Sequence, residues 1–148
     1  MTSPAPVGVW QEVLASARDS ATCTVYPGKF SVEHGRKATL EILSSDPRAT
    51  AIIAGGNMLM EGALLALREA DVRVGRDVSF VGCDDVALAE VHEPPIAVVR
   101  RDIGAVGVAA AELLLADLDP GDGADEAPRE IVLPTEFVNR PSCAPPGR

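Results

Sequence analysis

A short apolar run that ends in two carboxylates constrains the fold of this chain more than any other feature. The run VSFV covers residues 78–81, stops at Gly82, and is followed one residue later by Asp84 and Asp85. Branched and aromatic residues bounded by turn residues are typical of a buried β-strand. Open α/β sheets bind ligands beyond the carboxyl ends of their strands. The pattern therefore predicts that this strand directs the two acids at such a crevice.

The rest of the chain alternates between helical and strand-like patterns. Helices are predicted at residues 8–19, 31–44, 58–70 and 102–118, and strands at residues 22–26, 49–54, 78–81, 96–99, 131–133 and 136–138. This alternation predicts an α/β fold, in which a parallel sheet with right-handed crossovers is flanked by helices. We expect the tail, residues 141–148, to be loosely held.

The composition indicates a globular chain that does not bind DNA by itself. The chain has 148 residues, of which 47% are apolar, enough for one hydrophobic core, and its net charge of -9 repels phosphate backbones. No apolar run is long enough to span a membrane, and the start, MTSPAPVG, lacks the regions of a signal peptide. Three widely spaced cysteines, Cys23, Cys83 and Cys143, predict reduced thiols in a cytoplasmic protein.

The sequence around the two acids resembles the signature of the LacI/GalR transcriptional repressors. The resemblance lies in VSFVGCDD, residues 78–85, and in PPIAVVR, residues 94–100, and it extends from about residue 8 to residue 142. It implies the C-terminal subdomain of an effector-binding domain with the fold of type I periplasmic binding proteins. The parts that it implies are a subdomain core at 1–101, a crossover helix and loop belonging to a missing N-terminal subdomain at 102–128, and terminal strands and tail at 129–148.

Two residues are the leading candidates for contact with a small-molecule effector. Asp84 stands at the carboxyl end of a strand and can accept hydrogen bonds from sugar hydroxyls, whereas we expect Asp85 to cap a turn or helix. Phe30 lies just before a predicted helix, in a turn whose aromatic ring, by the resemblance, packs on the effector. The alternative for Phe30 is a hydrophobic staple at the helix start.

Two further candidates depart from the pattern of the repressors. Arg101 stands where those proteins commonly have Gln; it would favour a ligand with an acidic group, unless it is simply solvated or salt-bridged. Asn57 follows two glycines that only weakly resemble a phosphate loop, and we expect it mainly to cap the next helix. Cys83 replaces the usual aromatic residue. These departures leave the identity of the effector open.

Two predicted helices carry more apolar surface than one face requires. The helix at 58–70 is apolar almost all round, so either neighbouring helices cover its second side or it forms a subunit interface. The resemblance implies a dimer interface, with contacts at Leu59, Ala63, Ala66 and Leu67. In the helix at 102–118, about 25 Å long, Glu112 is the only charge between residues 103 and 116. Monomers rarely expose such a surface, so we expect the chain to be self-associated, domain-swapped or poorly soluble.

The function implied by the resemblance is a regulatory binding module for a sugar or related polyol, which would contact DNA only through a headpiece missing from this sequence. The alternatives are a phospho-receiver or small enzyme using Asp84 and Asp85, or a periplasmic sugar-binding protein. A receiver would need a lysine after a later strand, and none follows Lys37. His34 and His92 lie in no recognisable catalytic or metal motif, so we expect no enzymatic activity, metal or cofactor.

Overall fold

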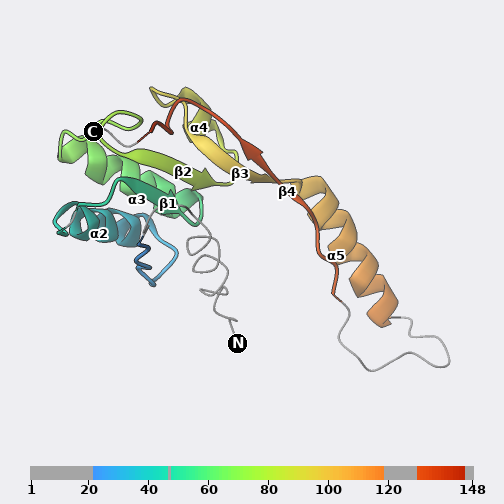
Figure 1. Cartoon of the computed structure of the whole chain (residues 1–148). Helices are drawn as coiled ribbons and strands as arrows, with labels where there is room; N and C mark the ends of the chain where they lie inside the picture. Colours follow the sequence, from blue (N-terminus) through green and yellow to red (C-terminus); the bar gives the residue numbers. More distant parts are fainter. Residues whose placement is uncertain (1–21, 47, 119–129, 146–148) are drawn as a thin grey trace.

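The computed structural model describes residues 22–46, 48–118 and 130–145, in which a four-stranded sheet carries helices (Figure 1). The strands lie in the order β1 (Ala51–Ala54), β2 (Ser79–Cys83), β3 (Ala97–Arg101) and β4 (Thr135–Val138). The helices are α2 (Val32–Leu43), α3 (Asn57–Glu69), α4 (Ala87–Val91) and α5 (Ile103–Leu118). The first three strands are parallel, and β4 runs antiparallel to β3. The predicted α/β architecture is confirmed, with one antiparallel strand at the edge.

The hydrophobic core lies where the sheet meets α3. Alternate strand residues are buried, as the period of a strand requires, among them Ile52, Phe80 and Val98. Six consecutive or near-consecutive positions of α3 are also buried, namely Met60, Gly62, Ala63, Leu64, Ala66 and Leu67. The short helix α4 adds Ala89. Most apolar side chains of α3 are therefore buried within this chain.

Helix α2 covers a second side of α3, and two glycines allow the two helices to approach closely. A β-carbon on Gly35 would overlap the backbone of Leu59, and one on Gly62 would overlap the carbonyl of Val32. Any larger residue at either position would push the helices apart, because backbone atoms cannot rotate away from the clash. Of the two explanations for the apolar character of α3, burial by a neighbouring helix is the one that the structure shows.

Where their residues are described, the predicted helices and four of the six predicted strands agree with the structure within a few residues. Ser31 caps α2, with its Oγ accepting a hydrogen bond from the His34 amide at 3.1 Å. The cap of α3 is Gly56 and not Asn57, which is already the first helical residue; its Oδ1 instead accepts from the Met58 amide at 2.7 Å. The helix predicted at 8–19 lies outside the described residues.

Two predicted strands are wrong. Residues 22–26 are mostly exposed and pair with no strand among the described residues, and β1 remains an edge strand of the sheet. Residues 131 and 132 are also exposed and residue 133 is partly buried, and β4 begins only at Thr135, where it faces Arg101. Both segments have strand-like composition, but a strand needs a hydrogen-bonding partner, which local propensity does not supply.

The C-terminal residues 141–145 are packed against the sheet, so the expectation of a loose tail is wrong for the part that the structure describes. Ser142 is fully buried: its hydroxyl donates to the Phe80 carbonyl and accepts from the Ala97 amide, both at 2.7 Å. The Phe80 amide in turn donates to the Ser142 carbonyl at 2.9 Å. The tail thus joins β2 to the start of β3.

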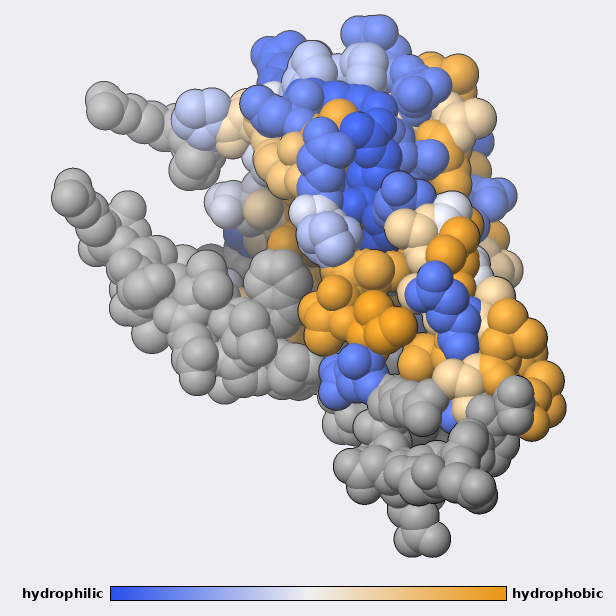
Figure 2. All heavy atoms as spheres, turned by 90° about the vertical axis from the view of Figure 1, so that its right-hand side faces the viewer, coloured by the Kyte–Doolittle hydropathy of each residue, from blue (hydrophilic) through white to orange (hydrophobic). Residues whose placement is uncertain are grey.

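Helix α5 leaves the sheet as an arm. None of its residues is buried, and it extends away from the sheet (Figure 1). Seen from the side of the arm, hydrophobic residues cover much of the lower half of the described surface, with hydrophilic residues gathered above them (Figure 2). Within the ranges that the structure describes, no helix has the length and apolar character needed to cross a membrane.

Candidate functional site

The carboxyl ends of the three parallel strands meet at one edge of the sheet, as the fold requires. Asp84 follows β2, Arg101 ends β3, and Gly55 and Gly56 follow β1. The pairing register places Ala54 beside Gly82, and hence the turn after β1 beside the turn after β2. This edge collects the four sequence-predicted ligand residues or the turns that hold them.

Asp84 and Arg101 form an ion pair at this edge. The Arg101 Nε donates to Asp84 Oδ1 at 2.9 Å, and one terminal guanidinium nitrogen donates to the same oxygen. The Asp84 side chain is 22% exposed and that of Arg101 is 53% exposed. The expectation of a salt-bridged arginine is therefore met, and the partner is the leading candidate acid itself.

The backbone of Asp84 is held in an uncommon conformation. Its φ of 75° lies in the left-handed region, which aspartate tolerates better than most residues with a side chain. The Asp84 amide donates to the Val99 carbonyl at 3.0 Å, which extends the contact between β2 and β3 beyond the last strand residue. The direction of the Asp84 side chain is thus set by the turn as well as by Arg101.

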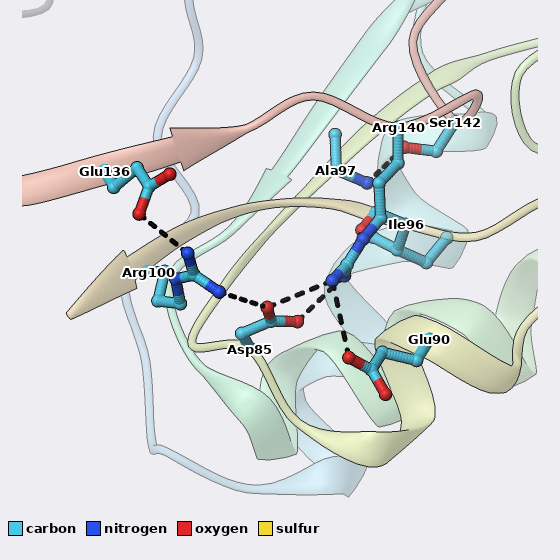
Figure 3. A network of polar contacts seen from close by, with 8 residues as sticks. All are labelled: Asp85, Glu90, Ile96, Ala97, Arg100, Glu136, Arg140 and Ser142. Carbon is cyan, nitrogen blue, oxygen red and sulfur yellow. Dashed lines mark hydrogen bonds and ion pairs between the residues drawn. The ribbon is translucent and has the colours of Figure 1, made fainter. Parts of the chain in front are cut away.

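Asp85 is bound by arginines and does not cap a helix, since the cap of α4 is Val86. The two terminal nitrogens of Arg140 donate to the two carboxylate oxygens of Asp85, at 2.8 and 3.0 Å (Figure 3). Arg100 approaches the same carboxylate at 3.6 Å and also pairs with Glu136 at 2.7 Å. Asp85 has a structural role, as expected, but its partner is the arginine side chain of Arg140 and not a backbone amide.

Phe30 lies against the turn after β1, and its side chain is 55% exposed. A β-carbon at Gly56 would overlap the Phe30 ring, so the absence of a side chain at Gly56 makes room for the aromatic face. A hydrophobic staple is not available to Phe30, because the fourth residue of α2 is Gly35. Next to this turn, Asn57 uses Oδ1 locally and leaves its amide nitrogen at the exposed surface.

The thiol of Cys83 lies directly before Asp84 and is partly buried. Burial raises the pKa of Cys83, and the negative charge of Asp84 raises it further, while Arg101 lowers it. The thiol of Cys83 is therefore neutral around pH 7, although it lies next to the charged pair of Asp84 and Arg101.

The four residues predicted for a dimer interface are not on a free surface. Ala63, Ala66 and Leu67 are buried in the core of the chain, and Leu59 is half-buried against α2. Within this chain these three side chains pack in the core and offer no exposed contact surface, and the dimer contacts expected there stay a prediction. The periodicity of α3 showed that it is buried on two sides, but not by which neighbours.

A groove of about 860 Å³ lies at the other end of the strands from the candidate acids, near the amino ends of β2 and β3. Leucines of α3 and α4, together with the segment before β2, form its apolar walls, and arginines lie at its rim; its residues include Leu64, Leu65, Leu88, Val72, Val74, Arg68, Arg73 and Arg76. None of the predicted ligand residues lines this groove. Among the described residues, no group of three histidines, cysteines or acids is arranged to hold a metal ion.

The residues that sequence analysis missed are Arg100, Arg140 and Ser142. Arg140 and Ser142 act on partners between 44 and 62 residues away in the chain. No local pattern predicts such contacts, because the sequence around a lone arginine or serine in a terminal segment looks the same whether the residue is buried or solvated.

Comparison with known families gives a match over nearly the whole chain. The Periplasmic binding protein-like domain family matches residues 8–143. The transcriptional repressor PurR of an Escherichia coli strain is 32% identical over 120 residues, which cover 81% of this chain and 34% of that protein. This chain therefore spans about a third of the length of the curated relatives that it matches.

Two solved structures of similar fold are of regulators. A LacI-family regulator from Enterococcus faecium with bound ribose is 30% identical, has a TM-score of 0.67, and is matched over 82% of this chain and 43% of its own. A Lac repressor dimer bound to operator and an anti-inducer is 25% identical, with a TM-score of 0.68 over 90% of this chain and 39% of its own.

Proposed function

Because the chain belongs to the Periplasmic binding protein-like domain family, we propose that it is the effector-sensing part of a LacI-family transcriptional regulator. Relatives of this kind are named as repressors of the helix-turn-helix type. We place the contact with DNA in a headpiece outside these 148 residues, because the chain is acidic and repels a phosphate backbone. The proposal puts the protein in the cytoplasm, with its DNA, and gives it no catalytic role.

The observation that carries this proposal is the pair formed by Asp84 and Arg101 at the carboxyl edge of the sheet. The bonds between them use Nε and one terminal nitrogen of Arg101 and a single oxygen of Asp84. Within the described residues, this leaves the other Asp84 oxygen as an acceptor beside the remaining guanidinium donors. Adjacent hydroxyls of a sugar can donate to the first and accept from the second. The exposed Phe30 ring offers an apolar face for the C–H side of a sugar.

The ion pair also bears on the charge of the ligand. An unpaired Arg101 would favour an acidic ligand, but Asp84 already neutralises it. An anion would have to displace one charge to reach the other, whereas a neutral polyol can bind to both. We therefore propose a neutral polyhydroxyl effector in preference to a sugar acid, with Asp84, Arg101, Phe30 and the amide nitrogen of Asn57 as its contacts.

Isothermal titration calorimetry with ribose and a panel of neutral sugars and sugar acids tests this assignment. Loss of a charge-assisted hydrogen bond costs about 1.5–3 kcal/mol, so Asp84→Asn should weaken the binding of the best neutral sugar by roughly 10- to 100-fold. Phe30→Ala should weaken it as well. Glu41→Gln, a change at an exposed acid of α2, is the matched control and should bind like the wild type. Equal affinity of Asp84→Asn and wild type would overturn the assignment.

We further propose that the chain forms a homodimer through α5 and not through α3. The sides of α3 that remain exposed carry Glu61, Arg68 and Glu69, which are costly to desolvate. On α5, by contrast, exposed apolar residues repeat at spacings of three and four, in a seam formed by Val108, Ala111, Leu115 and Leu118. Such a seam is the pattern by which helices pack along one another.

A further inference from the structure

The two neighbouring acids at the edge of the sheet differ in how firmly they are held. Asp85 is the deeper one, with 10% of its side chain exposed against 22% for Asp84. Arg140, itself only 16% exposed, grips Asp85 with two parallel hydrogen bonds and also donates to the Ile96 carbonyl at 3.0 Å (Figure 3). Paired bonds of this kind fix orientation as well as distance, which a single point contact does not.

Arg140 is in turn anchored by its own segment. Two residues later, the buried Ser142 joins the Phe80 carbonyl to the Ala97 amide, and its own amide donates to the Pro95 carbonyl at 3.2 Å. Before it, β4 pairs with β3 up to Val138. The guanidinium of Arg140 therefore projects from a segment that is tied to the sheet on both sides, and it acts as a fixed point for the turn that follows β2.

We propose that Arg140 is a positioning residue for Asp84, and that it acts through Asp85. The proposal rests on the proposed function in taking Asp84 as the ligand acid. Asp84 has a left-handed backbone, with a φ of 75°, and its amide must meet the Val99 carbonyl. A left-handed residue of this kind persists only where its surroundings hold it. The clamp on the next residue supplies that restraint, so that the Asp84 carboxylate points at the ligand site before a ligand arrives.

Arg100 cannot supply the same restraint. It reaches the Asp85 carboxylate only at 3.6 Å, its side chain is 48% exposed, and its shorter contact is with Glu136 at 2.7 Å. An exposed ion pair of this kind contributes little, because water and salt screen it. The fork from Arg140 is shorter, more buried and bidentate, so the position of the turn depends on the C-terminal segment.

Amide hydrogen exchange of the full 148-residue chain tests the proposal without any ligand. In Arg140→Gln, protection of the Asp84 amide should fall by about tenfold or more, while the amides within β1 and β2 keep theirs. Arg140→Lys, which keeps the charge but loses the fork, should fall between wild type and Arg140→Gln. Arg36→Gln is the matched control, because it breaks another forked pair, with Glu69, far from this edge.

Ribose titration of the same variants supplies the second readout. Arg140→Gln should weaken ribose binding by about tenfold, and the double variant with Asp85→Asn should bind no more weakly than Asp85→Asn alone, because the two residues act in series. Unchanged protection of the Asp84 amide in Arg140→Gln, or an equal loss across β1 and β2, would overturn the positioning role. A wild-type chain that ignores ribose and every other sugar would defeat the proposed function instead, and the exchange data would still decide the role of Arg140.

Discussion

Ser142 and Phe80 form two hydrogen bonds with each other, although they lie 62 residues apart in the chain. The Ser142 hydroxyl donates to the Phe80 carbonyl, and the Phe80 amide donates to the Ser142 carbonyl. The same hydroxyl accepts a hydrogen bond from the Ala97 amide, so one buried side chain bonds to both β2 and β3. The C-terminal segment is thus a structural part of the sheet.

Replacing this hydroxyl should therefore destabilise the fold. Ser142→Ala leaves the Ala97 amide without its partner and leaves the Phe80 carbonyl with only the weak contact from the Cys143 thiol, at 3.6 Å. A buried polar group that loses its hydrogen bond costs about 1–3 kcal/mol, so the free energy of unfolding in urea should fall by about 2 kcal/mol or more. Ser44→Ala removes an exposed hydroxyl that bonds to the Leu40 carbonyl and should cost less than about 0.5 kcal/mol. Equal effects of the two changes would contradict the role of Ser142.

The same substitution should have opposite effects at two helical glycines, because Gly62 lies where α2 and α3 approach closely and Gly107 lies on the exposed helix α5. Gly62→Ala gains about 1 kcal/mol of helix propensity, but its methyl group would overlap the Val32 carbonyl, and overpacking of this kind costs about 1–3 kcal/mol. We expect a net loss of unfolding free energy. Gly107→Ala on α5 meets nothing within 4 Å and should stabilise the fold by roughly 0.5–1 kcal/mol. Thermal unfolding of the two variants measures the difference, and a stabilising Gly62→Ala would be inconsistent with the packing.

The exposed seam of α5 predicts the mass of the chain in solution. Light scattering on the purified protein should give a dimer, because Val108 and Leu115, 60% and 66% exposed, need a covering surface. Changing both residues to Glu should give a monomer with unchanged helix content by circular dichroism. Val91→Glu places the same charge at an exposed position of α4 and should leave the dimer intact. A wild-type monomer would mean that α5 is not the contact.

The raised pKa of Cys83 predicts slow and tunable alkylation. The thiolate is the reactive form, and a raised pKa lowers its fraction at pH 8, so iodoacetamide should modify Cys83 more slowly than the exposed Cys23. Asp84→Asn removes a charge that raises this pKa and leaves Arg101, which lowers it; labelling of Cys83 should therefore become faster. Mass spectrometry of the modified peptides over time measures both rates. Slower labelling in Asp84→Asn than in the wild type would show that the sign is wrong.

Local patterns in the sequence predicted most of the elements because their signals are local. The run before Asp84, the capping Ser31 and the periodicity of α3 each depend on residues within a few positions of one another. The same reasoning failed at residues 22–26 and 131–133, where strand-like composition met no partner strand among the described residues. Propensity says that a segment can extend, whereas pairing decides whether it becomes a strand.

Sequence patterns were enough to predict the α/β order of the chain, the edge of the sheet that carries Asp84, Phe30 and Arg101, and an apolar α5 that its own sheet does not cover. Which charges meet at that edge depends on the folded chain. Asp84 neutralises Arg101, Arg140 clamps Asp85, and α2 buries a side of α3 that could have been an interface. Periodicity is fixed by backbone geometry within a few residues, but ion pairs and helix contacts depend on segments that only folding brings together.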